Sequence, residues 1–192
     1  MLINFGVPSF QSSEATGATV TERKVSFASQ PQQIMWLRGM VDSYRETYPI
    51  RARARDIAFR QRSCPPRDPT CQALAIAGWV QDNITYVNEM PETFQTPTTT
   101  VAEGYGDCDD FSTLIASMCE SLGIATELVG MEWGQGAARY YKHIFPRAVV
   151  PQGGRVYRVP LDATLTTPVD GTQDPIRIAL ARGVKNLRIF VA

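Results

Sequence analysis

The sequence has few of the residues that would indicate a metal site or a disulfide scaffold. It contains four cysteines and a single histidine, His143, among 192 residues. So few cysteines argue against a small fold held together by disulfides, and they favour a reducing compartment. With one histidine and no second close pair of cysteines, the chain lacks the usual zinc ligands, so we expect no metal.

Long apolar runs and an excess of charge are missing as well. No stretch approaches the roughly 20 apolar residues that cross a bilayer, so we expect neither a transmembrane helix nor a membrane partner. The first residues lack a basic segment followed by an apolar one, so we expect no secretory signal. The 19 basic and 19 acidic residues balance, which argues against a generic nucleic-acid binder. There is no phosphate-binding glycine motif, and we expect no cofactor.

The charges are distributed unevenly along the chain. Residues 69–138 contain ten acidic residues and no Lys or Arg. Either these acids pair internally with arginines from both flanks, or a basic face docks on an acidic partner. The arginine-rich stretch 51–67 also has two possible roles. It is either a solvated helix face or a contact surface for an acidic partner or nucleic acid.

Apolar periodicity predicts helices in the first half of the chain. They are expected over residues 31–48, where Pro49 would end the helix, and then over 50–62 and 72–83. Residues 85–87 look extended. Residues 88–106, with two prolines and three consecutive threonines, are predicted to form a loop. Residues 1–30 are polar and are predicted to be an extended or flexible arm.

The second half begins with the most regular helical pattern and continues with strands. Apolar residues recur at helical spacing from Phe111 to Leu122, and Gly123 follows as a C-terminal cap. Strands are predicted over 125–131, 140–150, 155–161 and 185–191, with Gly153-Gly154 as a turn. Helices that precede mostly antiparallel strands indicate an α+β fold.

The most informative segment for chemistry runs from Gly104 to Leu114. Cys108 falls on the first turn of the predicted helix, where free N–H groups and the helix dipole stabilise a thiolate. Asp107, Asp109 and Asp110 oppose this effect, because negative charge raises the pKa of a thiol. A positive partner is therefore needed, and His143, in a strand-like context, is the only histidine available. Asp162, at the end of the next strand, could orient its ring.

These residues resemble the motifs of the transglutaminase-like superfamily, which shares the papain-like cysteine-protease core. The segment 106–110 is similar to that superfamily's Gly-Asp-Cys-Asp-Asp motif. His143 with the two apolar residues after it is similar to the histidine motif. Residues 157–164 are similar to the aromatic strand ending in Asp-Pro-Thr, with Ala163 where proline is common. The resemblance covers about residues 70–165. In a subgroup encoded by tailed phages and prophages, the resemblance extends upstream to about residue 31.

The resemblance implies a fold and a set of roles. The fold would place the catalytic cysteine at the N-terminus of a central helix packed on an antiparallel sheet that holds His and Asp. Cys108 would be the nucleophile, His143 the general acid and base, and Asp162 the orienting carboxylate. Gln95 is a candidate oxyanion donor, and its alternative role is to brace the loop. Residues 69–192 would be the catalytic core and 31–68 a helical extension.

The other three cysteines have their own expected roles. Cys119 lies on the apolar helix face and is predicted to be core packing. Cys64 and Cys71 flank a proline-rich loop and could either close a disulfide or remain reduced.

Two functions follow from the resemblance. The first is a thiol enzyme that acts on amide or peptide bonds through an acyl-enzyme, with hydrolysis favoured over amine transfer and a protein or peptide as substrate. The alternative is a phage virion or assembly protein that uses the fold as a binding module and reaches other virion proteins through its N-terminal arm. We expect the protein in the host cytoplasm or associated with the virion.

Overall fold

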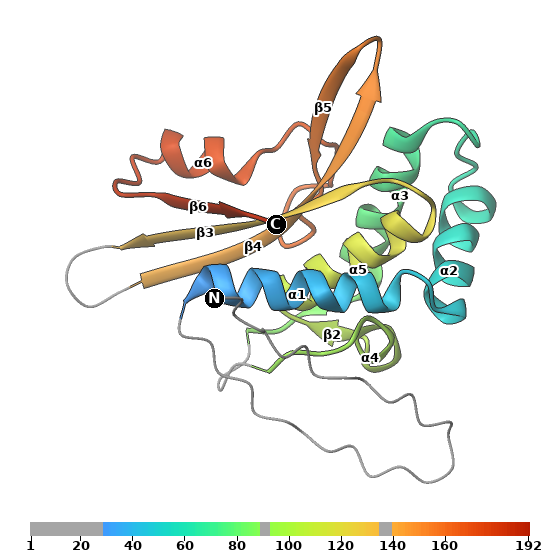
Figure 1. Ribbon diagram of the computed structural model, residues 1–192, viewed down its shortest axis with the longest axis horizontal. Helices are drawn as coiled ribbons and strands as arrows, with labels where there is room; N and C mark the ends of the chain where they lie inside the picture. Colours follow the sequence, from blue (N-terminus) through green and yellow to red (C-terminus); the bar gives the residue numbers. More distant parts are fainter. Residues whose placement is uncertain (1–28, 89–92, 135–139) are drawn as a thin grey trace, which may run out of the picture.

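The computed structural model describes residues 29–88, 93–134 and 140–192, and confirms an α+β fold (Figure 1). The predicted arm, except for its last two residues, lies outside the described residues. The helices are α1 (Gln30–Tyr44), α2 (Tyr48–Arg55), the π-helix η1 (Asp56–Gln61), α3 (Pro69–Asn83), α4 (Pro97–Glu103), α5 (Cys108–Ser121) and α6 (Pro175–Ala181). The strands are β1 (Thr85–Tyr86), β2 (Tyr105–Gly106), β3 (Thr126–Gly134), β4 (Tyr140–Gln152), β5 (Arg155–Pro160) and β6 (Arg188–Val191).

The strands form one antiparallel sheet of four strands and one short parallel pair. The large sheet has the order β5-β4-β3-β6. β3 and β4 are paired over the whole of β3, with Met131 opposite His143. The predicted turn at Gly153-Gly154 joins β4 to β5, and both glycines have positive φ. The short pair, β1 with β2, was not predicted, and it aligns Tyr86 with Gly106.

Helices cover both faces of the large sheet. Leu128 of β3 and Ile144 of β4 pack against Ile34 and Leu37 of α1 and Ala116 of α5. Val129, Met131 and Phe145 face the other way and pack with Ala179 of α6. The alternation of strand side chains therefore produces two apolar faces, with α1 and α5 on one and α6 on the other (Figure 1).

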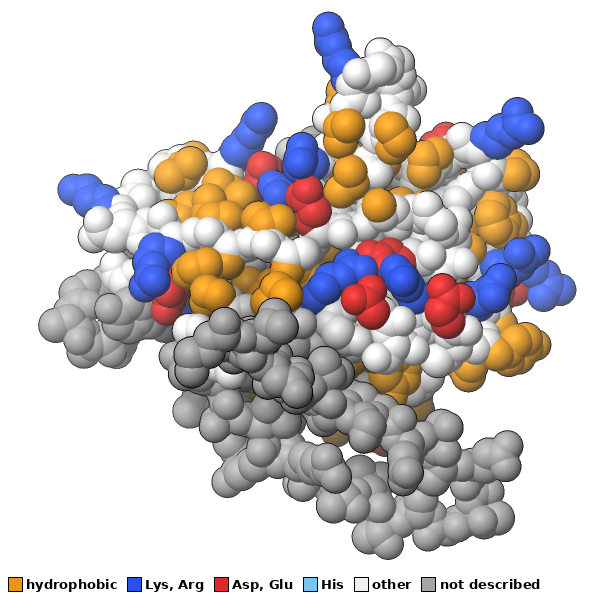
Figure 2. All heavy atoms as spheres, viewed as in Figure 1, with side chains coloured by type: hydrophobic (Ala, Val, Ile, Leu, Met, Phe, Trp, Pro, Cys, Tyr) orange, Lys and Arg blue, Asp and Glu red, His pale blue; other side chains and the backbone are white. Residues whose placement is uncertain are grey.

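Helix α6 was not predicted, and it leaves part of its apolar surface in contact with solvent. Leu180 of α6 and Ile189 and Val191 of β6 are exposed. Figure 2 shows hydrophobic side chains gathered over these two elements. Scattered exposed apolar residues are normal for a folded protein.

The predicted helical extension shares its core with the rest of the chain. Ile50, Ala54 and Ile57 belong to the same buried cluster as Ile76 of α3 and Leu114 of α5. This continuity means that α2 and η1 support the helix on which Cys108 lies. The division into an extension and a core at residue 68 remains a prediction.

The helix predicted over 31–48 is shorter than expected. α1 ends at Tyr44, and α2 begins at Tyr48 with Pro49 in its first turn. The prediction that Pro49 ends a helix is therefore wrong, because proline is well tolerated in the first turn, where its missing N–H is not needed. Tyr48, the first residue of α2, is 82% exposed.

The loop predicted over 88–106 contains a helix. In α4, Pro97 occupies the first turn and the Thr96 hydroxyl accepts a hydrogen bond from the Thr99 backbone N–H. Gly104 ends the helix with a φ of 72°, in the left-handed region that favours glycine. Pro97, one of the residues that predicted a loop, instead starts this helix together with Thr96.

The acidic middle of the chain pairs with arginines from both flanks. Glu120 of α5 bonds to Arg38 and Arg45 of α1. Burial would raise the pKa of Glu120, but the hydrogen bonds from Arg38, Thr126 and Arg45 lower it below its usual value. Further pairs of this kind are Glu127 with Arg147 and Arg158, Glu132 with Arg188, and Asp82 with Arg62. These contacts support internal pairing, and Figure 2 shows charges of both signs along α1.

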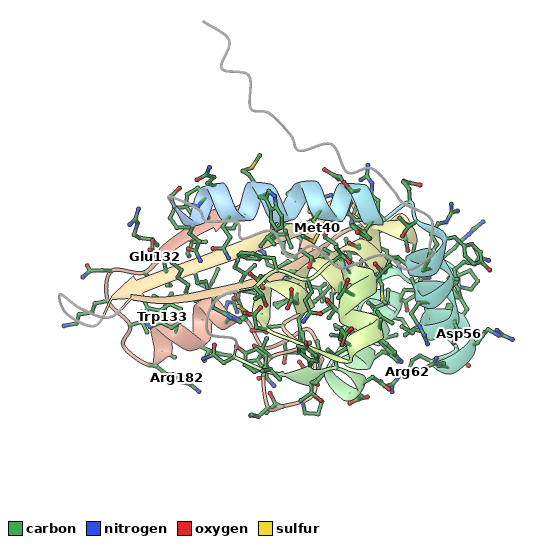
Figure 3. All side chains as sticks on the ribbon, turned by 90° about the horizontal axis from the view of Figure 1, so that it is seen from below. Met40, Asp56, Arg62, Glu132, Trp133 and Arg182 are labelled. Carbon is green, nitrogen blue, oxygen red and sulfur yellow. A yellow bond between two sulfur atoms is a disulfide. The ribbon has the colours of Figure 1, made fainter. Side chains whose placement is uncertain are left out.

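The arginine-rich stretch lies at one end of the molecule. Figure 3 shows Asp56 and Arg62 at the end opposite Glu132 and Trp133 of β3. Arg60 pairs with Asp56, and Arg53 lies over the Trp79 ring at 5.4 Å. These contacts favour a solvated face held by local pairs.

Among the described helices, none is long and apolar enough to cross a bilayer.

The four cysteines divide into a disulfide and two thiols. Of the two states expected for Cys64 and Cys71, the structure has the disulfide, which closes the proline-rich loop. Disulfides are rare in reducing compartments, so this bond argues against the compartment that the cysteine count favoured. Cys119 is fully buried in the core, as predicted, and burial together with Glu120 raises the pKa of its thiol.

Candidate active site

Cys108 is the first residue of α5, and the turn before it is closed by a capping box. The Asp107 carboxylate accepts a hydrogen bond from the Asp109 backbone N–H at 3.1 Å. The Asp110 carboxylate accepts one from the Asp107 backbone N–H at 3.3 Å. Two carboxylates therefore accept hydrogen bonds from backbone N–H groups at the helix start. The cap holds Cys108 at the positive end of the helix dipole, and its side chain is partly exposed.

Gly106 permits the tight approach of β2 to this cap. A Cβ atom at Gly106 would lie 2.8 Å from Cβ of Asp110. Any larger residue would therefore push Asp110 away from the backbone N–H that it caps. Glycine, which has no Cβ atom, permits this close contact between strand and helix.

His143 and Asp162 meet, as the sequence led us to expect. His143 Nε2 lies 2.7 Å from Asp162 Oδ2. The other carboxylate oxygen, Oδ1, accepts hydrogen bonds from the Thr164 backbone N–H at 3.0 Å and its hydroxyl at 2.7 Å. Burial would raise the pKa of Asp162, but the hydrogen bonds from His143 and Thr164 hold it below its usual value. Asp162 is thus a buried carboxylate, 3% exposed, and charged at neutral pH.

Thr164 closes the turn at Asp162 although Ala163 stands where proline is common. Both Thr164 donors converge on a single carboxylate oxygen, and Ala163 is buried. Side chains of Asp commonly form such turns with the backbone two residues on. This turn leaves Oδ2 directed to the histidine.

Ser112 joins the helix of Cys108 to the strand of His143, and the sequence analysis did not single it out. Its hydroxyl lies 2.5 Å from the Cys108 carbonyl oxygen and 3.0 Å from the Ile144 carbonyl oxygen. One hydroxyl proton is thus shared between the first turn of α5 and β4, next to His143. No spacing rule in the sequence could have revealed this contact between residues 32 positions apart.

The contacts of Gln95 fit the second of its two expected roles, which is to brace the loop. Its side-chain amide donates to the Tyr105 carbonyl oxygen at 3.2 Å, and its backbone N–H donates to Asp110 Oδ1 at 2.7 Å. Both bonds fix the segment before α4 to the turn that leads to Cys108. The oxyanion role of Gln95 stays a prediction.

Among the described residues, the three carboxylates around Cys108 form a cluster that could offer ligands to a cation. Asp107, Asp109 and Asp110 are buried, and one oxygen from each lies within 4.8 Å of the others. Two of them are engaged in the capping box, and Asp109 accepts a hydrogen bond from Gln33 of α1 at 3.2 Å. These bonds give the cluster a structural role at the helix start.

Comparison with known families agrees with the fold. The model of the transglutaminase-like superfamily core matches residues 55–162, which is more than half of the chain and ends on Asp162. The chain therefore belongs to the transglutaminase-like superfamily, a class of proteins that includes thiol enzymes. Comparison with the curated proteins gave no match.

Similar solved structures come from three bacteria. A protein of Cytophaga hutchinsonii, provisionally described as a cysteine protease, has a TM-score of 0.49 at 18% identity, over 81% of this chain and 55% of its own. A protein of Parabacteroides distasonis, provisionally described as a protease, has a TM-score of 0.49 at 14% identity, over 83% of this chain and 36% of its own. LapG of Legionella pneumophila has a TM-score of 0.42 at 12% identity, over 70% of this chain and 74% of its own. The chain thus spans about half or less of the first two proteins.

Proposed function

We propose that this protein is a thiol hydrolase that cleaves amide bonds of a protein or peptide through an acyl-enzyme on Cys108. The observation that supports it most is the bond of 2.7 Å between His143 Nε2 and a buried, ionised Asp162. A carboxylate can only accept, so Nε2 carries a proton in this contact, and Nδ1 is the ring nitrogen left to exchange a proton with Cys108. The imidazole is thereby prepared to act as a base.

The reaction would proceed in two stages. In the first, Nδ1 of His143 takes the thiol proton and the Cys108 sulfur attacks the carbonyl carbon. The tetrahedral intermediate collapses, the C–N bond breaks, and the leaving nitrogen takes the proton from His143. In the second, His143 takes a proton from water as the water oxygen attacks the thioester carbon; the C–S bond breaks, the acid leaves, and the proton returns from His143 to the Cys108 sulfur. An amine in place of water would make the protein a transglutaminase, and we favour water because it needs no second binding site.

The coupling of Cys108 to His143 can be measured by alkylation. In the wild type, iodoacetamide should modify Cys108 far faster than the buried Cys119, with an apparent pKa well below the ~8.5 of a free thiol. In His143→Ala, the apparent pKa of Cys108 should return upward, because the positive partner is lost. Mass spectrometry of the two peptides against pH gives both values. An ordinary thiol titration of Cys108 in both proteins would refute the proposal.

The phage origin that the sequence suggested is also a proposal, and of the two expected locations the Cys64–Cys71 disulfide favours the virion over the reducing host cytoplasm. Its motivation is the polar segment before α1. Gln30, at the start of α1, is buried and donates to the Met131 carbonyl oxygen at 3.1 Å, so a truncation should stop before it. We expect that removing residues 1–28 leaves cooperative unfolding intact and removes the chain from purified phage particles, as measured by mass spectrometry. Particles that retain the truncated chain would contradict this role of the arm.

A further inference from the structure

Tyr86 is fixed beside the turn that leads to Cys108, although the proposed chemistry does not use it. β1 and β2 pair in parallel, and Tyr86 lies opposite Gly106, two residues before Cys108. The backbone N–H of Val87 donates to the Gly106 carbonyl oxygen at 2.9 Å. The backbone at Tyr86 is therefore tied to the same short segment that positions the nucleophile.

The ring of Tyr86 rests on the first turn of the helix that begins at Cys108. It meets the Phe111 ring edge to face, with centroids 5.9 Å apart and an interplanar angle of 88°. Phe111 is buried and lies three positions after Cys108, so the two share a face of α5. Tyr86 itself is 47% exposed. Its ring is thus held on one side by the core and borders solvent on the other, where a substrate would arrive.

The charges around Tyr86 belong to the candidate active site. Burial and then the negative charges of Cys108, Asp107, Asp109 and Asp162 raise the pKa of Tyr86 to about 12. Cys108 and Asp162 come from different elements, so the phenol lies within the electrostatic reach of both the helix start and the end of β5. A phenol with such a pKa keeps its proton at neutral pH, and it can donate a hydrogen bond but not act as a base.

We propose, on the basis of the function above, that Tyr86 donates its O–H to the oxyanion of the acyl-transfer intermediate. When the Cys108 sulfur bonds to the carbonyl carbon, the carbonyl π electrons move to the oxygen. The Tyr86 O–H, held beside the start of the helix that carries Cys108, stabilises that charge. On collapse the C=O bond re-forms and the leaving group departs, while Tyr86 keeps its proton. Gln95 is less suited, because its amide already donates to Tyr105.

The experiment compares two reagents that use the same thiol. Iodoacetamide alkylates sulfur by displacing iodide and forms no oxyanion. p-Nitrophenyl acetate acylates sulfur through a tetrahedral intermediate and releases p-nitrophenol. Loss of one oxyanion donor costs about 10²- to 10³-fold in other acyl-transfer enzymes. In Tyr86→Phe, acylation of Cys108 should therefore slow by about 10²-fold while alkylation stays within about twofold.

Tyr105→Phe is the matched control. Tyr105 is 39% exposed, lies on the partner strand β2 opposite Thr85, and loses the same phenol oxygen. Both rates should match the wild type in this variant, and thermal melting should show that both variants fold. Equal acylation in Tyr86→Phe and the wild type would overturn the role of Tyr86 and leave the proposed function standing. Equal slowing of both reactions would also overturn it. A wild type in which Cys108 is never acylated would overturn the proposed function itself.

Discussion

Replacing Cys108 by alanine should abolish turnover while the protein stays folded. The thiol is the group that would form the acyl-enzyme, so its removal should lower the rate of p-nitrophenyl acetate hydrolysis by at least about 10⁴-fold, as in other enzymes that lose their nucleophile. Cys108 is partly exposed at a helix start, where alanine is well tolerated, and the capping box does not use its side chain. The melting temperature should therefore change by only a few degrees.

The matched control for this variant is Cys119→Ala. Cys119 is the other free thiol and is fully buried in the core. Its truncation should lower the melting temperature, because it removes buried contacts, but the hydrolysis rate per folded molecule should not change. The pair of variants separates loss of chemistry from loss of stability. Hydrolysis that survives in Cys108→Ala at the wild-type rate would mean that another group is the nucleophile.

Asp162→Asn should have the second largest effect. An amide can offer its NH₂ group to His143 Nε2 and so favour the tautomer that has the proton on Nδ1. That tautomer cannot take a proton from the thiol, and the corresponding change in a Ser-His-Asp enzyme costs about 10⁴-fold. We expect a loss of similar size in the rate of Cys108 acylation, measured with p-nitrophenyl acetate. Thr164→Val, which removes one hydrogen bond to Oδ1 but keeps the carboxylate, should lose less than about tenfold.

The same carboxylate should also affect stability as the pH changes. The pKa of Asp162 in the folded protein lies below that of the unfolded chain, which is about 3.9. Its contribution to the free energy of unfolding is therefore fully present above that value, and it is lost as the pH falls through the folded pKa. Urea unfolding at several pH values should show a steeper loss of stability below about pH 4 in the wild type than in Asp162→Asn. Identical slopes would contradict the assigned direction.

Much of the architecture could be predicted because it is local in the sequence. The stripe from Phe111 to Leu122 predicts α5 almost to the residue, and Gly153-Gly154 predicts the turn between β4 and β5. Where the prediction failed, the local signal was ambiguous. Pro49 predicted a helix end and Pro97 a loop, yet both lie in the first turn of a helix. α6 is only seven residues long and leaves a weak periodic signal.

The sequence alone determined the residue types, their order and their local setting. A cysteine at a helix start, the only histidine on a strand and an aspartate at a strand end follow from periodicity and from the resemblance to one superfamily. Tertiary structure alone decided which of these side chains meet. Thr164 holds Asp162 toward His143, Ser112 spans two elements, and the pairing of β1 with β2 places Tyr86 opposite Gly106, two residues before Cys108. Such contacts depend on strand register and on packing between distant segments, which no local pattern of apolar and polar residues encodes.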